Sequence, residues 1–154
     1  MPLQEILEKY PKTGDYLIEV LLEYQHTKQN HYLTEAELKT IAEYLNVTES
    51  RVSSVVSFYT FFSLEPKGQH VIQICHDVPC YLNEQPSLVK TIKNLLGIDV
   101  GETTDDKLFT LEYTSCLGAC DQAPAMRIGE KTFTDLTPNK VKAIISEYRG
   151  KRHA

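Results

Sequence analysis

The sequence predicts a protein of mixed α+β class, with an N-terminal helical bundle over residues 1–66 and a small α/β domain over residues 67–154. Apolar residues recur at helical spacing through the first sixty residues. Pro66-Lys67-Gly68 then breaks this pattern. Beyond the break, short β-branched segments alternate with helical ones, which is typical of an α/β layer.

The first part predicts three helices. The first has an apolar stripe formed by Leu17, Val20, Leu21 and Tyr24. Thr34 and Glu37 form a capping box at the start of the second helix, which we expect to end at Asn46. Thr48 is expected to cap the third.

The second part predicts the order strand, helix, strand, hairpin, helix. The expected strands are 70–74 and 108–113, the helix between them is 87–96, and the hairpin turns at Gly129-Glu130. Thr137-Pro138 is expected to open the last helix. Because each strand leads into a cysteine pair, we expect the two pairs to converge at one edge of the sheet.

Composition excludes several classes of protein. The chain has 154 residues, of which 42% are hydrophobic and 24% charged, and its net charge of −5 provides no basic field for nucleic acid or anionic lipid. No stretch reaches the roughly 20 apolar residues of a membrane span, and the N-terminus lacks the pattern of a signal peptide. We therefore expect a cytoplasmic protein, in which thiols stay reduced.

The only cysteines form two close pairs, Cys75/Cys80 and Cys116/Cys120, with 35 residues between the pairs. Four such thiols can hold a zinc ion, a [2Fe–2S] cluster or two disulfides. Structural zinc sites usually use tighter C-x2-C turns, whereas a [2Fe–2S] cluster takes two thiolates on each iron and suits longer loops. Spacing favours the cluster, and zinc and disulfides stay open.

The residues around the cysteines indicate how such a site would be tuned. Pro79 and Gly118 predict stiff loops whose backbone N–H groups point at sulfur. If Asp77 and Asp121 point inward, their negative charge would disfavour the reduced cluster and lower its reduction potential. Such residues more often form turns with their side chains in water. His76 could replace a ligand, as in Rieske centres, but we interpret it as a loop or surface residue.

A helix-turn-helix over residues 33–56 is a second interpretation. Its recognition helix, residues 49–57, offers only Arg51 for phosphate contacts, and residues 1–67 have a net charge of −4. No glycine-rich phosphate loop follows a strand, so we expect no nucleotide or flavin site in this chain.

Two stretches carry a family resemblance: Val71-Ile72-Gln73-Ile74-Cys75 with Cys80, and Cys116-Leu117-Gly118-Ala119-Cys120-Asp121-Gln122-Ala123-Pro124. They resemble the thioredoxin-like [2Fe-2S] ferredoxin family, and the resemblance extends over residues 13–149. The family includes the 24-kDa subunit of complex I (NADH:quinone oxidoreductase) and the small subunits of NAD(P)-linked hydrogenases and formate dehydrogenases. The implied fold is a helical bundle followed by a thioredoxin-like ferredoxin domain.

The resemblance also implies a function. Cys75, Cys80, Cys116 and Cys120 would bind one [2Fe–2S] cluster in an electron-transfer subunit of an NAD(P)H-linked oxidoreductase complex. The subunit would have no catalytic site of its own, because FMN and NAD(P)H would bind to a partner flavoprotein subunit. Further iron–sulfur subunits are expected as partners, and no nucleic acid. A zinc-stabilised docking subunit and a DNA-binding regulator are the alternatives.

Overall fold

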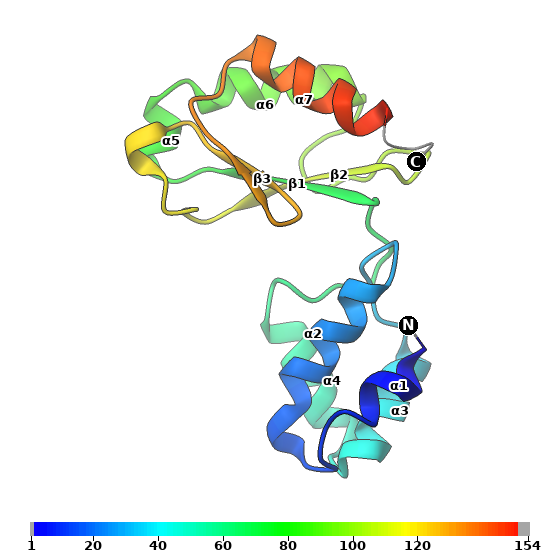
Figure 1. The fold of residues 1–154 in the computed structure, drawn as a ribbon. Coiled ribbons are helices and arrows are strands. Elements are labelled where there is room, and N and C mark those ends of the chain that lie inside the picture. Colours follow the sequence, from blue (N-terminus) through cyan, green and yellow to red (C-terminus); the bar gives the residue numbers. More distant parts are fainter. Residues whose placement is uncertain (1, 151–154) are drawn as a thin grey trace. The chain divides into compact units, whose positions relative to one another are not determined.

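The computed structural model describes residues 2–150, and the chain divides into two compact units between Lys67 and Gly68. Each unit has its own hydrophobic core. The ribbon in Figure 1 shows helices alone in the first unit and helices packed on a sheet in the second. Mixed helices and a four-stranded mixed sheet confirm the predicted fold class.

Unit 1 is a small helical bundle. Its elements are α1 (Leu3–Leu7), the 3-10 turn η1 (Gly14–Tyr16), α2 (Leu17–Thr27), α3 (Glu35–Leu45) and α4 (Glu49–Phe58). The predicted stripe of α2 is buried, and Val20 and Leu21 are fully enclosed. Asn46 ends α3 in the left-handed conformation, and the side chain of Thr48 caps α4, both as predicted.

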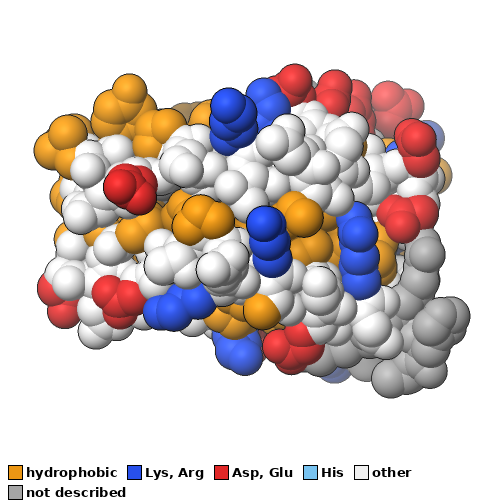
Figure 2. All heavy atoms as spheres, turned by 90° about the horizontal axis from the view of Figure 1, so that it is seen from above, with side chains coloured by type: hydrophobic (Ala, Val, Ile, Leu, Met, Phe, Trp, Pro, Cys, Tyr) orange, Lys and Arg blue, Asp and Glu red, His pale blue; other side chains and the backbone are white. Residues whose placement is uncertain are grey.

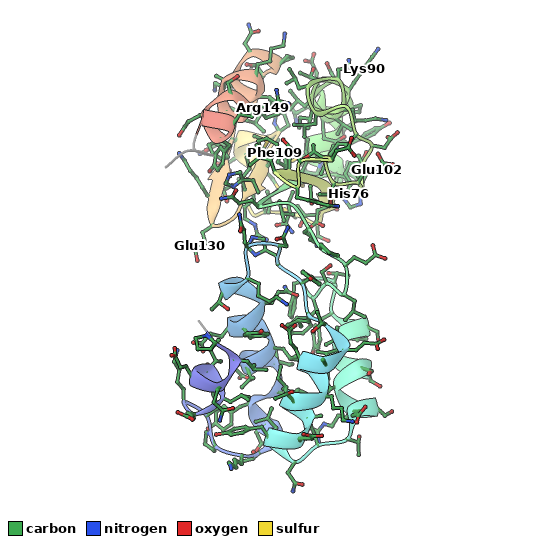
Figure 3. The ribbon with its side chains drawn as sticks, turned by 90° about the vertical axis from the view of Figure 1, so that its right-hand side faces the viewer. His76, Lys90, Glu102, Phe109, Glu130 and Arg149 are labelled. Atoms are coloured by element: carbon green, nitrogen blue, oxygen red, sulfur yellow. The ribbon has the colours of Figure 1, made fainter. Side chains whose placement is uncertain are left out.

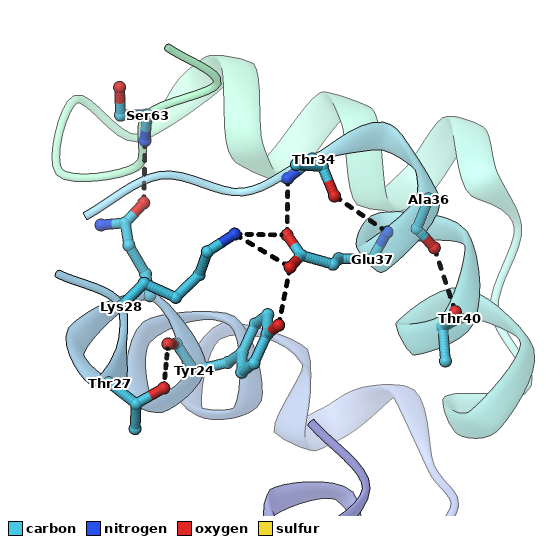
Figure 4. Close-up of polar contacts among 9 residues, drawn as sticks. Tyr24, Thr27, Lys28, Thr34, Ala36, Glu37, Thr40 and Ser63 are labelled. Atoms are coloured by element: carbon cyan, nitrogen blue, oxygen red, sulfur yellow. Dashed lines mark hydrogen bonds and ion pairs between the residues drawn. The ribbon is translucent and has the colours of Figure 1, made fainter. Parts of the chain in front are cut away.

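The capping box at the start of α3 is present and is extended by two further contacts (Figure 4). Glu37 accepts hydrogen bonds from the backbone N–H of Thr34 at 2.7 Å, from the hydroxyl of Tyr24 at 2.6 Å and from Lys28 at 2.8 and 2.9 Å. The carboxylate therefore joins α2 and the segment after it to α3. Burial alone would raise the pKa of Glu37, but these hydrogen bonds outweigh it and lower the pKa to about 2.

A second polar link ties α2 to the segment after α4. The Gln25 amide, buried in the core, donates to the carbonyl of Phe61 at 2.8 Å and accepts from the backbone N–H of Ser63 at 2.9 Å. Both ends of the amide are thus satisfied, as a buried polar group requires.

Unit 2 is built on a sheet with the strand order β2-β1-β3-β4. Its elements are β1 (His70–Cys75), α5 (Val78–Leu82), α6 (Gln85–Leu96), β2 (Phe109–Thr114), the 3-10 turn η2 (Cys120–Gln122), β3 (Met126–Ile128), β4 (Lys131–Phe133) and α7 (Pro138–Gly150). Strands β1 and β2 are parallel, and β3 runs antiparallel to both of its neighbours. In Figure 1, α6 and α7 cover one face of this sheet.

Gly68 begins unit 2 where the backbone crosses β2 very closely. Its N–H donates to the hydroxyl of Thr110 at 2.6 Å. A Cβ placed on Gly68 would lie 2.5–2.8 Å from backbone atoms of Phe109. Only glycine fits this approach, and it begins the run of backbone bonds that leads into β1.

Several boundaries follow the prediction. Gly97 ends α6 with a positive φ, the hairpin turns at Gly129-Glu130, and the Thr137 hydroxyl accepts from the N–H of Lys140 at the start of α7. The prediction included α1 and η1 in the helical first part without naming them as separate helices, and it missed α5 and η2, because helices of three to five residues show no apolar period. Among residues 2–150, no helix has the length and apolarity to span a membrane.

Candidate metal centre

The parallel pairing of β1 and β2 brings the two cysteine segments to the same edge of the sheet. Cys75 is the last residue of β1 and lies opposite Thr114, the last residue of β2. Cys116 follows only two residues after that strand end. The predicted convergence of the two segments is confirmed, and its cause is the register of the two strands.

The first pair is buried. Cys75 and Cys80 are 1% and 2% exposed and pack with Ala125 in a small cluster of their own. Leu117 and Ala119, which lie between the cysteines of the second pair, and Ala123, which follows them, pack partly buried against this cluster. Cys80 lies in α5, where the sequence predicted a loop, so the helix fixes the direction of its side chain. The second cysteine loop therefore covers the first pair.

The second pair is exposed. The sulfurs of Cys116 and Cys120 are 3.2 Å apart, well beyond the roughly 2.05 Å of a disulfide. Two thiolates on one tetrahedral metal at about 2.3 Å would be roughly 3.8 Å apart, so the two sulfurs would have to move slightly apart to bind one metal. Gly118, at φ +77°, donates its N–H to the Cys116 sulfur at 3.3 Å. This confirms the predicted inward N–H at Gly118.

The thiols of the two pairs influence each other's ionisation. Burial raises the pKa of Cys80 to about 11, although the backbone N–H of Ala125 lowers it; the thiol of Cys75 and charge on Cys120 raise it further. The pKa of Cys120 is also raised, mainly by its hydrogen bond with Cys116, then by burial and by charge on Cys116, Cys75 and Asp77. A metal cation would reverse this balance, since a coordinated thiol loses its proton.

The donor set fits a [2Fe–2S] cluster. All four cysteines are free, the buried pair packs against neighbours of the exposed pair, and a backbone N–H points at one sulfur. Two thiolates per iron and N–H···S hydrogen bonds are what such a cluster takes from a protein. Over residues 2–150, no three His, Cys, Asp or Glu side chains are gathered as for a single metal ion.

The other residues that the sequence singled out lie around the pairs. His76 is exposed, its Nδ1 lies 2.9 Å from the carbonyl oxygen of Thr114, and its ring stacks on Tyr113. Asp77 precedes α5 and its charge acts on Cys120. Asp121 is exposed in η2.

Sequence reasoning missed α5, although Asp77 two residues before Pro79 is a helix-start signal. It also missed the amide of Ala125 beside Cys80, which carries no sequence signal because a backbone group is common to all residues.

Comparison with known proteins identifies relatives over nearly the whole chain. Residues 3–149 match the model of the family described as thioredoxin-like [2Fe-2S] ferredoxin. A subunit of the NADH-quinone oxidoreductase of Rickettsia bellii is 37% identical over 147 residues, which cover 95% of this chain and 88% of that protein. NADP-reducing hydrogenase subunit HndA of Solidesulfovibrio fructosivorans is 34% identical over 146 residues, covering 94% of this chain and 83% of that one.

A solved structure shares the fold. The crystal structure of an NAD+-reducing [NiFe]-hydrogenase in the air-oxidized state superposes with a TM-score of 0.75 at 21% identity. The match covers 92% of this chain but only 24% of the hydrogenase chain, so this chain corresponds to about a quarter of that longer polypeptide.

Proposed function

The chain belongs to the thioredoxin-like [2Fe-2S] ferredoxin family, and on this premise we propose that it is the electron-transfer subunit of an NAD(P)H-linked oxidoreductase complex. The relatives are named as subunits of an NADH-quinone oxidoreductase and of an NADP-reducing hydrogenase. The observation that supports the proposal is the register of the parallel strands β1 and β2, which places the segments that carry the two cysteine pairs at the same end of the sheet.

Cys75, Cys80, Cys116 and Cys120 would hold one [2Fe–2S] cluster. When bound, such a cluster accepts and releases a single electron. The chain's own residues then set the conditions for that exchange. The buried pair shields one side from water, the exposed pair leaves the other side open to a partner, and the Gly118 N–H stabilises negative charge on sulfur.

The partner we propose is a flavoprotein subunit that binds FMN and NAD(P)H, with further iron–sulfur subunits beyond it. The nucleotide chemistry belongs to that subunit, and this chain contributes no catalytic site of its own. The complex is of the NADH:quinone, hydrogenase or formate dehydrogenase type. We propose a cytoplasmic location as well, where thiols would stay reduced and free to bind iron.

The test is a visible absorption spectrum of the anaerobically purified full chain, followed by EPR after dithionite reduction. We expect absorption bands that bleach on reduction. Cys116→Ser should lose or severely perturb the cluster, whereas His76→Ala should keep it, because its ring bonds to a backbone carbonyl. A colourless protein with stoichiometric zinc would refute the proposal, and an unchanged EPR signal in Cys116→Ser would refute the ligand assignment.

A further inference from the structure

A groove of about 400 Å³ opens beside the first cysteine pair. Its lining residues are His76, Tyr81, Gln85, Pro86, Val89 and Tyr113. His76 and Tyr81 directly follow Cys75 and Cys80 in the chain. An occupant of the groove would therefore lie next to the proposed cluster.

The groove is part of a larger apolar surface. Tyr113 stacks on His76 with ring centroids 5.1 Å apart, and these two rings form one wall. Val78 and Leu82 of α5 are 69% and 75% exposed, and Tyr81 between them is exposed too. Figure 2 shows hydrophobic side chains gathered at the end of the unit where α5 lies in Figure 1. Exposed apolar patches of this kind mark sites of interaction.

The floor of the groove carries a polar group with no partner. Gln85 is 2% exposed, and its Nε2 has no hydrogen-bond partner among the described residues. A buried donor left unpaired destabilises the free protein. The other deeply buried glutamine, Gln25, has both ends of its amide satisfied. Because this Nε2 exposes less than 1 Å², an acceptor brought by an occupant, such as a main-chain carbonyl, would pair with it only after the Gln85 side chain turns toward the groove.

Charge decides the kind of occupant. Residues 73–86 and 112–125, which carry the cysteines and most of the groove, contain Asp77, Glu84, Glu112 and Asp121 and no lysine or arginine. The α6 side of the groove adds Lys90 and Lys93, and Lys93 forms an ion pair with Asp99. Figure 2 agrees, since Lys and Arg gather over the middle of that view and not at the α5 end. Four thiolates around two irons would add further negative charge. A complementary surface must be basic, and a second copy of this acidic face would be repelled.

We propose that this groove docks a basic segment of the partner protein, with an apolar side chain in the groove between lysine or arginine residues and a main-chain carbonyl bound to Gln85. The inference rests on the proposed function, because the partner is the flavoprotein that exchanges electrons with this subunit. It adds the docking site and the chemistry of the segment that fills it.

The experiment measures binding of the cluster-loaded full chain to the purified flavoprotein subunit of its own complex, by calorimetry at low and high salt. Tyr113→Ser should weaken binding about tenfold or more, as loss of a buried aromatic anchor does. Gln85→Leu should also weaken binding several-fold yet raise the Tm by about 2–4 °C, since it removes the unpaired donor. A purely structural glutamine would instead lower the Tm.

A charge-reversal pair tests the electrostatic part. Glu84→Lys should weaken binding several-fold at low salt, and the difference should shrink at high salt. Glu130→Lys is the matched control, because Figure 3 shows Glu130 and His76 on opposite sides of the unit, and it should bind like the wild type.

The outcomes separate this inference from the proposed function. Groove variants that bind like the wild type while their absorption spectra show an intact cluster overturn the docking site alone. Equal effects of Glu84→Lys and Glu130→Lys, no binding by the wild type, or a homodimer that Tyr113→Ser dissociates also overturn it. A wild-type chain without a cluster overturns the proposed function, whatever the binding result.

Discussion

Glu37 should contribute measurably to the stability of unit 1, and Glu37→Gln isolates its charge. Glutamine keeps the shape and can still accept from the N–H of Thr34, because glutamine also serves at this position of a capping box. It loses the ion pair with Lys28 and the strong hydrogen bond from Tyr24. The substitution therefore removes the charge and spares most of the cap.

The magnitude follows from the pKa of Glu37. A folded-state pKa of about 2, against 4.5 for an ordinary glutamate, corresponds to roughly 3 kcal/mol at neutral pH. The side chain is 21% exposed, so water competes for the carboxylate and we expect about 2 kcal/mol. Because folding lowers this pKa, the stabilisation is complete above pH 4.5 and is lost as the pH falls towards 2.

The assay is urea unfolding followed by far-UV circular dichroism at pH 7, 5 and 3, with Glu35→Gln as the control. Glu35 lies in the same helical turn and is exposed, so its variant should differ from the wild type by less than about 0.5 kcal/mol. The gap in free energy of unfolding between Glu37→Gln and the wild type should be equal at pH 7 and 5 and smaller at pH 3. A Glu37→Gln variant as stable as the control at pH 7, or a gap that does not change with pH, would refute the reasoning.

Three further substitutions test other parts of the fold and site. Gln25→Leu should destabilise unit 1 by about 1–3 kcal/mol in urea unfolding, because it leaves the part-buried carbonyl of Phe61 and N–H of Ser63 without their partner. Gly68→Ala should lower the free energy of unfolding of unit 2 by about 1–3 kcal/mol, because the new Cβ overlaps the backbone of Phe109. The positive φ of Gly118 would cost an alanine about 1–2 kcal/mol, so in Gly118→Ala the backbone should shift and move the N–H away from the Cys116 sulfur. We therefore expect this variant to lose its cluster faster than the wild type on exposure to air.

Gly150→Ala is the common control for the glycine variants. A Cβ at Gly150, in α7, meets no heavy atom within 4 Å, so this variant should equal or exceed the wild type in stability. If Gly68→Ala behaves the same way, the close approach to β2 does not constrain the chain. If the Gly118 variant keeps its cluster as long as the wild type, the N–H···S bond has no role in holding it.

The parts of the fold that were predictable are those with local signals. Thr34 and Glu37 identify the start of α3 because the capping box depends on four consecutive residues, and Gly97 marks the end of α6 because few other residues accept its φ. The strand before Cys75 was likewise evident from its β-branched residues. In each case the physical cause lies within one turn or one strand.

The parts that escaped prediction depend on residues distant in sequence. Cys75 and Cys80 are buried whereas Cys116 and Cys120 are exposed, and this difference follows from how the second loop packs. The spacing of the cysteines in the sequence does not predict it. The groove likewise needs Gln85 and Tyr113, from α6 and β2, to face one space. The short helix α5 lacked a periodic signal, and only Asp77 and Pro79 at its start pointed to it.

The central claim, that the four cysteines together hold one [2Fe–2S] cluster, is tested most directly by EPR of the dithionite-reduced full chain with spin quantitation. The account predicts a signal of about one unpaired spin per chain, from one electron shared by two irons. A reduced sample that is EPR-silent and contains one zinc per chain would contradict it.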